Sequence, residues 1–271
     1  MRKRKPAVAG QFYPARSDEL SDMVHAYVDN SGVTPAGERV VALVVPHAGY
    51  PYSGPTAGHG YARVQGKHPK RVILMGCSHR YPIETASIVT EGAFDTPVGS
   101  FPIDEVFAKD LARKAKSHRS DAHALEHALE VQLPFLQAVM GEVPIVPVLL
   151  GSTPSAWHAE LGAQLARMVD AEDLMVSSTD LSHYLDQERA CAIDRRSIDV
   201  VLSKNLDAFA RGLNDDSCSM CGGVAVYVTM AFAMALGAVA WSLLDYRTSA
   251  AVTGDYDRVV GYAAITMERP E

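Results

Sequence analysis

Three histidines each lie a few residues after a short apolar run, and this shared position suggests one common site. The runs cover 39–46, 71–76 and 174–178, and the histidines that follow them are His47, His79 and His183. Continuous apolar runs are typical of strands covered on both faces. In open α/β sheets, ligands gather beyond the carboxyl ends of such strands. Neutral imidazole binds iron, copper and zinc, so His47 and His79 are candidate metal ligands. Any one of these histidines alone would be interpreted as an ordinary loop residue.

Asp180 precedes His183 by three residues, which suggests a proton-transfer pair. If the segment forms a helical turn, the two side chains lie on one face. The carboxylate would then orient the imidazole and raise its basicity, giving a general base. The alternative is that Asp180 caps a turn and His183 lies on the surface.

Cys218 and Cys221 form a single Cys-x-x-Cys, which two glycines follow. One such pair fits a redox pair, half of a zinc site or chance. The other two cysteines, Cys77 and Cys191, are isolated, so we do not expect a four-cysteine zinc site. The glycines would let the Cys221 thiolate approach an ion at the start of a helix, and a helix N-terminus lowers a thiol pKa.

His123, Glu126 and His127 spell His-x-x-Glu-His, the inverted zinc-protease pattern. The match is weak, because the true motif needs a sustained helix and a distant third ligand. We expect a helix over 126–140, but Pro134 interrupts it. A metalloprotease is therefore not the favoured interpretation.

Strands and helices alternate along the chain, and they must position these residues. We expect strands over 39–46, 71–76, 143–150, 174–178, 238–246 and 259–267, and helices from Ser53 and over 104–116, 126–140, 155–169, 187–202, 206–213 and 224–236. This order predicts an α/β fold, a single-domain three-layer α/β/α arrangement of residues 1–271 with a mostly parallel central sheet.

Composition excludes several classes of protein. The chain has 271 residues, 48% of them apolar, and a net charge of −7. It is too apolar to be disordered, and its spread-out acidity argues against a nucleic-acid partner. The basic start, 1–6, precedes no long apolar segment, so we expect a solvated terminus and no signal peptide. The uncharged stretch 224–244 contains Gly237, and we interpret it as a buried helix and strand, not a membrane span. These observations predict a cytoplasmic protein with no membrane partner.

Several ordered motifs resemble those of the MEMO family, proteins that accompany radical-SAM and AMMECR1-type partners in bacteria and archaea. The first is Pro-His-Ala-Gly-Tyr-Pro-Tyr-Ser-Gly at 46–54, and the others lie at 9–14, 76–79, 126–135, 178–183 and 221–222. Together they cover nearly the whole chain. The resemblance implies a fold like that of class III extradiol dioxygenases, with a metal pocket.

The resemblance also implies roles for individual residues. His47, His79 and Cys221 would be the metal ligands. His183, oriented by Asp180, would occupy the place of the dioxygenase acid/base histidine. Glu126, His127 and Glu130 would line the pocket or support its ligands, with Glu126 and His127 counted among the catalytic candidates.

This ligand set contains a cysteine where the dioxygenases have a carboxylate. Fe(II) is the metal that the resemblance favours, whereas the softer thiolate shifts preference toward Cu(I) or Zn(II). The leading hypothesis is a non-haem Fe(II) dioxygenase-like oxidoreductase acting on a small aromatic or heterocyclic substrate. The alternatives are a copper- or iron-binding redox protein without turnover and a non-catalytic module that binds a peptide in the same cleft. Radical-SAM and AMMECR1-type proteins are the expected protein partners.

Overall fold

Four buried parallel strands form the centre of the main sheet in the computed structural model, which describes residues 3–118 and 120–270. In spatial order they are β2 (Val40–Val45), β8 (Leu174–Ser178), β3 (Val72–Cys77) and β7 (Ile145–Leu150). Every residue of β2, β7 and β8 is buried, as continuous apolar runs predict for strands covered on both faces. The predicted α/β fold with a parallel centre is confirmed.

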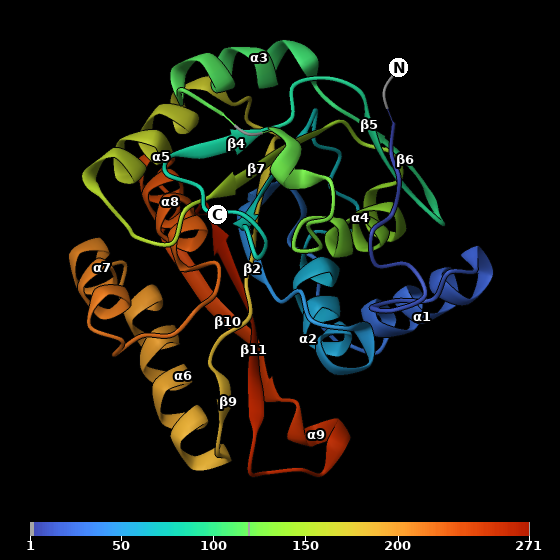
Figure 1. Ribbon diagram of the computed structural model, residues 1–271, viewed down its shortest axis with the longest axis vertical. Helices are drawn as coiled ribbons and strands as arrows, with labels where there is room; N and C mark the ends of the chain where they lie inside the picture. The colour runs from blue at the N-terminus through green and yellow to red at the C-terminus, as the bar shows by residue number, and fades with distance from the viewer. Residues whose placement is uncertain (1–2, 119, 271) are drawn as a thin grey trace.

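Antiparallel strands extend this sheet at both edges (Figure 1). On the β2 side, β11 (Val259–Glu268) pairs with β2, and β10 (Ala240–Thr248) pairs with β11. The short β9 (His183–Leu185) also pairs with β11, and β4 (Ala86–Ile88) pairs with β7 at the far edge.

Helices cover both faces of the sheet, as Figure 1 shows. One face carries α1 (Ser17–Asp29), α2 (Tyr50–Arg63) and α4 (Leu133–Met140), and the other carries α5 (Ala156–Met168), α6 (Gln187–Leu202), α7 (Leu206–Asn214) and α8 (Gly223–Ala235). The remaining helical segments are α3 (Glu105–Lys114), α9 (Ala250–Thr253) and the 3-10 turns η1 (Gly37–Arg39), η2 (Ser120–His123) and η3 (Glu130–Gln132).

The basic N-terminus is not a solvated tail in its described part. Lys3 and Arg4 form β1, which pairs in parallel with β5 (Ala93–Thr96), and β6 (Gly99–Pro102) completes this second small sheet. The Arg4 side chain is only 10% exposed and bonds the buried Glu130 carboxylate at 2.7 Å. A partner so far along the chain leaves no local sequence signal, so the expectation was wrong for Arg4, whereas Lys3 and Lys5 are exposed as expected.

The uncharged stretch 224–244 forms a helix and a strand. Helix α8 ends at Ala235, and β10 begins at Ala240. Between them Gly237 adopts a φ of +73°, a conformation that favours glycine. Throughout 3–118 and 120–270, every helix is too short or too polar to cross a membrane.

Two helix predictions are corrected by the structure. Residues 126–129 form a loop that ends in a turn, η3 follows, and α4 begins only at Leu133 with Pro134 in its first turn. The Glu126 carboxylate accepts hydrogen bonds from the amides of His127 and Ala128, and such local bonds compete with a helix. Proline in a first turn starts a helix.

Helix α2 begins at Tyr50 and not at Ser53. The extended Gly49 ends the preceding loop, and Pro51 in the first turn favours a start at this point. The Ser53 hydroxyl donates to the Ala48 carbonyl at 2.8 Å and caps no helix.

Candidate metal centre

Four donor side chains converge beyond the carboxyl ends of the central strands. His47 follows β2, Cys77 ends β3, His79 lies two residues further, and Cys221 precedes α8. One ligand atom of each lies within 4.8 Å of the other three. Cys221 Sγ is 3.2 Å from His47 Nε2, and Cys77 Sγ is 3.5 Å from His79 Nε2. We call these four residues the His–Cys cluster.

Ser178 fixes the orientation and tautomer of His47. The Ser178 hydroxyl donates to the Ala128 carbonyl at 2.5 Å and accepts from Gln132 Nε2 at 2.7 Å. Because its proton is already used, Ser178 Oγ accepts from His47 Nδ1 at 3.0 Å. The lone pair of His47 therefore lies on Nε2, which faces Cys221. An outer hydrogen bond of this kind is characteristic of metal-binding histidines.

Glu126 holds His79 in the same way. Its Oε1 accepts from His79 Nδ1 at 2.9 Å, and its Oε2 accepts from the His79 backbone amide at 2.6 Å. Nε2 of His79 is therefore the nitrogen left for a ligand. His79, Glu126 and His127 could also form a three-donor group by distance. However, four N–H groups already occupy the Glu126 carboxylate, so it supports a ligand better than it serves as one.

The two thiols differ in their ionisation. A hydrogen bond with Cys77, together with His47 and His79, holds the pKa of Cys221 well below that of a free cysteine, although burial acts the other way. The same bond and burial raise the pKa of Cys77. Cys221 is thus the thiolate of the pair.

Negative charge dominates the surroundings of the two imidazoles. Burial alone would lower the pKa of His47, but the Cys221 thiolate and Asp180 raise it to about 9. For His79, bonds with Cys221 and Glu126 outweigh burial and raise the pKa to about 10. The cluster therefore favours a cation, whether a proton or a metal ion.

The distances suit a single metal ion. Around a tetrahedral ion with nitrogen ligands at about 2.0 Å and sulfur ligands at about 2.3 Å, neighbouring donors are about 3.3–3.8 Å apart. The sulfur–nitrogen distances from Cys221 to His47 Nε2 and from Cys77 to His79 Nε2, 3.2 and 3.5 Å, are close to this range. Two cysteine sulfurs and two imidazole nitrogens form a donor set for iron, copper or zinc.

Close backbone packing brings Cys221 to this place. A Cβ at Gly222 would lie 2.5 Å from the Ser178 carbonyl oxygen, so only glycine lets the start of α8 meet the end of β8. The Cys221 amide donates to the Asp180 carbonyl at 3.2 Å. The Asp180 carboxylate accepts from the His47 amide at 2.8 Å, which ties the β2 loop to the same point.

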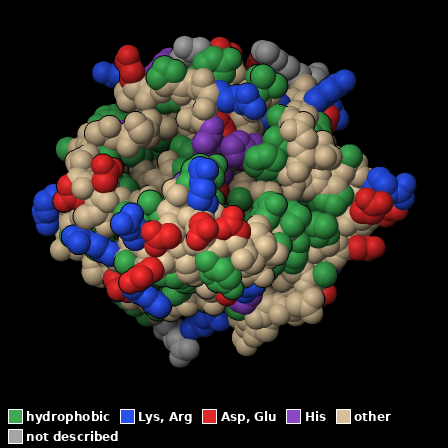
Figure 2. Space-filling model, turned by 60° about the horizontal axis from the view of Figure 1, so that its bottom comes forward, with side chains coloured by type: hydrophobic (Ala, Val, Ile, Leu, Met, Phe, Trp, Pro, Cys, Tyr) green, Lys and Arg blue, Asp and Glu red, His purple; other side chains and the backbone are tan. Residues whose placement is uncertain are grey.

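His127 lies beside the cluster as a neutral imidazole. Its ring centroid is 4.5 Å from that of His79 and 5.4 Å from that of His47, and the Phe12 ring covers it at 4.7 Å. Burial and the nearby His47 lower the pKa of His127 to about 4. Figure 2 shows histidine side chains gathered in a hollow of the surface, and the His79 side chain is 33% exposed.

His183 is placed differently from the helical expectation. Residues 179–182 are not helical, and His183 begins β9, where it pairs with Val260. Its ring lies against Tyr184. Burial raises the pKa of Asp180, and the nearby His183 acts in the opposite direction. Asp180 itself bonds the His47 backbone.

The sequence did not single out Cys77 or Ser178. Cys77 has no second cysteine near it in the sequence, but it directly follows the strand predicted over 71–76 and precedes His79 by two residues. Its position at a strand end was the available signal. Cys218, the other cysteine of the Cys-x-x-Cys, does not belong to the His–Cys cluster. Its side chain packs against Gly212, and Ser197 forms a hydrogen bond with its thiol.

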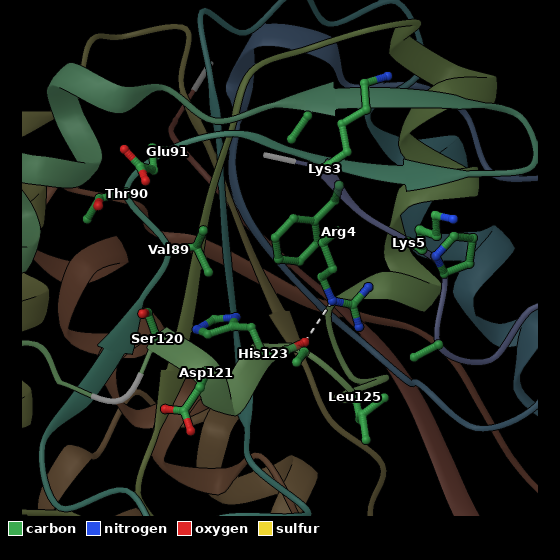
Figure 3. A pocket seen from close by; sticks show the side chains of 15 residues that line it. Lys3, Arg4, Lys5, Val89, Thr90, Glu91, Ser120, Asp121, His123 and Leu125 are labelled. Carbon is green, nitrogen blue, oxygen red and sulfur yellow. Dashed lines mark hydrogen bonds between the residues drawn. The ribbon is translucent and has the colours of Figure 1, made fainter. Parts of the chain in front are cut away.

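A separate cavity of about 480 Å³ lies near the N-terminus and is drawn in Figure 3. Lys3, Arg4, Glu91 and His123 are among its lining residues. Arg4 Nε donates to the His123 carbonyl at 2.7 Å, the bond dashed in Figure 3. None of the four cluster residues lines this cavity.

The sequence profile described as Memo-like protein matches residues 4–266. The chain belongs to the Memo-like family. A MEMO1 family protein of Methanopyrus kandleri is 37% identical over 98% of this chain and 99% of its own length. One from Thermotoga maritima is 35% identical with the same coverage, and one from Nitrosopumilus maritimus is 33% identical over 97% and 98%. The resemblance in the sequence motifs is thus confirmed.

A solved structure of an uncharacterized protein from Escherichia coli K12 shares the fold of this Memo-like chain. The TM-score is 0.50 at 14% sequence identity, over 84% of this chain and 99% of that one. This likeness concerns the fold alone.

Proposed function

We propose that this Memo-like protein binds one metal ion at the His–Cys cluster and uses it for oxidation–reduction chemistry on a small molecule. The observation that carries the proposal is the convergence of two imidazoles and two cysteines, one ligand atom of each lying within 4.8 Å of the others. The Nδ1 atoms of both imidazoles are held by Ser178 and Glu126, so the donors are oriented before a metal arrives.

Fe(II) is the metal we propose first, with an aromatic or heterocyclic substrate. When bound, it would supply electrons for reaction with dioxygen. A purely structural metal site needs no base beside it. Here a neutral His127 lies next to the partly exposed His79, which favours a reactive site.

The residues around the cluster would hold the substrate proton and exclude water. His127 Nδ1 lies 3.2 Å from Glu126 Oε1, and we propose that this neutral imidazole exchanges the substrate proton. The Phe12 ring shields this imidazole on one side. We propose His183, with Asp180, as a further proton carrier at the β9 edge.

A second candidate function is storage or transfer of Cu(I) without substrate turnover. The thiol of Cys77 favours it, because two sulfur donors shift a site toward softer ions.

Anaerobic purification followed by metal analysis tests both functions. The oxidation–reduction function predicts one iron per chain, which is lost in His47→Ala and retained in His127→Ala. It also predicts oxygen uptake with substrate that disappears in His127→Ala. His25→Ala, at an exposed position on α1, is the matched control and should behave as wild type. Copper at one per chain without oxygen uptake would favour the second. A reduced protein that binds neither iron, copper nor zinc would overturn both.

A further inference from the structure

The cysteines that are close together in the structure are not the two that are close together in the sequence. Cys218 and Cys221 are close in sequence, but Cys218 is buried against Gly212 and Ser197. Cys221 instead lies within 4.8 Å of Cys77, which comes from the end of β3. Cys221 is half-buried and lies beside the more exposed His79, so a small reagent can reach the Cys221 sulfur from this side. Cys191, the fourth cysteine, contacts Gln187 and Tyr246 on another part of the fold.

We propose that Cys77 and Cys221 form a reversible disulfide within the chain when the cluster holds no metal, and that a hydroperoxide is the oxidant. The inference rests on the proposed metal site, because the same two sulfurs serve as metal donors. A disulfide bond is about 2 Å long, so the sulfurs need to approach by less than about 3 Å from the observed separation.

The chemistry balances in two steps. The sulfur of Cys221 attacks a hydroperoxide; an S–O bond forms, the O–O bond breaks, and an alcohol or water leaves with a proton. The sulfur of Cys77 then attacks Cys221; the S–S bond forms, the S–O bond breaks, and water leaves. Two thiols lose two electrons and two protons, and the hydroperoxide is reduced by two electrons. A dithiol reductant reverses the reaction.

The disulfide would control metal occupancy. It removes both sulfur donors at once and leaves the imidazoles of His47 and His79 as the only members of the cluster able to bind. A bound metal would in turn keep the two sulfurs apart and protect them. Oxidation and metal binding should therefore exclude one another.

The test begins with metal-free, reduced full-length protein. One equivalent of hydrogen peroxide is added anaerobically, free thiols are alkylated, and the digested protein is analysed by mass spectrometry. We expect a linked peptide pair containing Cys77 and Cys221, which dithiothreitol reverses. Cys77→Ser should prevent the link, while Cys191→Ser, at a half-buried cysteine outside the cluster, should not.

Metal binding is then measured separately on reduced and oxidised protein with Zn(II) as the probe. We expect one Zn(II) per chain in the reduced protein and at least a hundredfold weaker binding in the oxidised protein. A Cys218–Cys221 link, a link between two chains, or sulfinic acid at Cys221 without a link would overturn the inference. Failure of the reduced protein to bind Zn(II), Fe(II) or Cu(I) would instead overturn the proposed metal site, even where the disulfide forms.

Discussion

In each imidazole of the His–Cys cluster, one hydrogen bond at Nδ1 leaves Nε2 as the nitrogen that can bind a metal ion. For His47 the deciding residue is Ser178, whose own proton is committed to the Ala128 carbonyl. Sequence reasoning identified His47 and His79 from their position after apolar runs. It could not identify Ser178, because a serine at a strand end is common and its partners lie far along the chain.

Ser178→Ala should weaken metal binding by about 10–100-fold, the usual effect of removing an outer hydrogen bond to a ligand. The variant leaves His47 free to rotate and to adopt the other tautomer. Competition with a chromophoric chelator for Zn(II) measures the change. Ser177→Ala is the matched control, since Ser177 is equally buried on the same strand but bonds Thr229. Equal affinities for the two variants would contradict this role.

His123 should make stability depend on pH. Burial lowers its pKa to about 4 from the ordinary 6.5, and Nε2 donates to the Ser87 carbonyl at 3.0 Å. In the unfolded chain His123 takes up a proton near pH 6.5, whereas in the folded protein it stays neutral until about pH 4. The contribution of neutral His123 to the free energy of unfolding is therefore complete above pH 6.5 and is lost as the pH falls toward 4. The total loss is about 3 kcal/mol.

Urea unfolding of wild type and His123→Gln at pH 7 and pH 5 measures this effect. The glutamine amide can still donate to the Ser87 carbonyl, but it does not titrate. Wild type should lose more free energy of unfolding between the two pH values than the variant does. An identical loss in both proteins would assign the pH dependence to other groups.

At the scale of elements, the strand ends were predictable and the loop between 126 and 132 was not. Continuous apolar runs marked β2, β3, β7 and β8 clearly, because buried parallel strands leave little room for polar residues. The segment after Glu126 has helix-forming residues, yet its carboxylate bonds the local amides. The same carboxylate also bonds His79, which the local sequence does not contain.

The junction between β8 and α8 depends on Gly222. Gly222→Ala would place a methyl group 2.5 Å from the Ser178 carbonyl, so the start of α8 must move away and carry Cys221 with it. We expect a loss of about 1–3 kcal/mol in stability and a metal affinity reduced at least tenfold. Thermal unfolding and chelator competition measure the two effects.

Gly49→Ala is the control for this substitution. Gly49 also lies beside the cluster, but an added Cβ would meet no atom nearer than 3.6 Å, and its φ of −55° suits alanine. It should bind metal as wild type does. If Gly222→Ala does so too, close packing at this junction is not what positions Cys221.

For the whole molecule, the buried Glu130 fastens the N-terminal segment to the rest of the fold. Its carboxylate accepts hydrogen bonds from the Ala7 and Val8 amides, the Tyr13 hydroxyl and the Arg4 guanidinium. The family resemblance placed Glu130 near the pocket, and these contacts assign it a structural task. No periodic pattern could have linked residues so far apart.

Glu130→Ala should cost about 3–5 kcal/mol, because it leaves the Arg4 charge buried without its partner. Urea unfolding measures the loss, and limited proteolysis should detect earlier cleavage before residue 14. Glu105→Ala, which removes a solvent-exposed pair with Lys109, is the control and should leave both measurements unchanged. Wild-type resistance to protease in Glu130→Ala would contradict the anchoring role.

The order of strands also dictates when the centre can exist during synthesis. Strand β2, the first of the sheet to be made, lies between β8 and β11, and β11 comes from the end of the described chain. Such distant pairings form late, since the intervening chain must first be complete. A nascent chain therefore presents His47, Cys77 and His79 without Cys221 for much of its translation. The proposed metal site is therefore complete only after Cys221 has been made, and until then the Cys77 thiol depends on the reducing power of its surroundings.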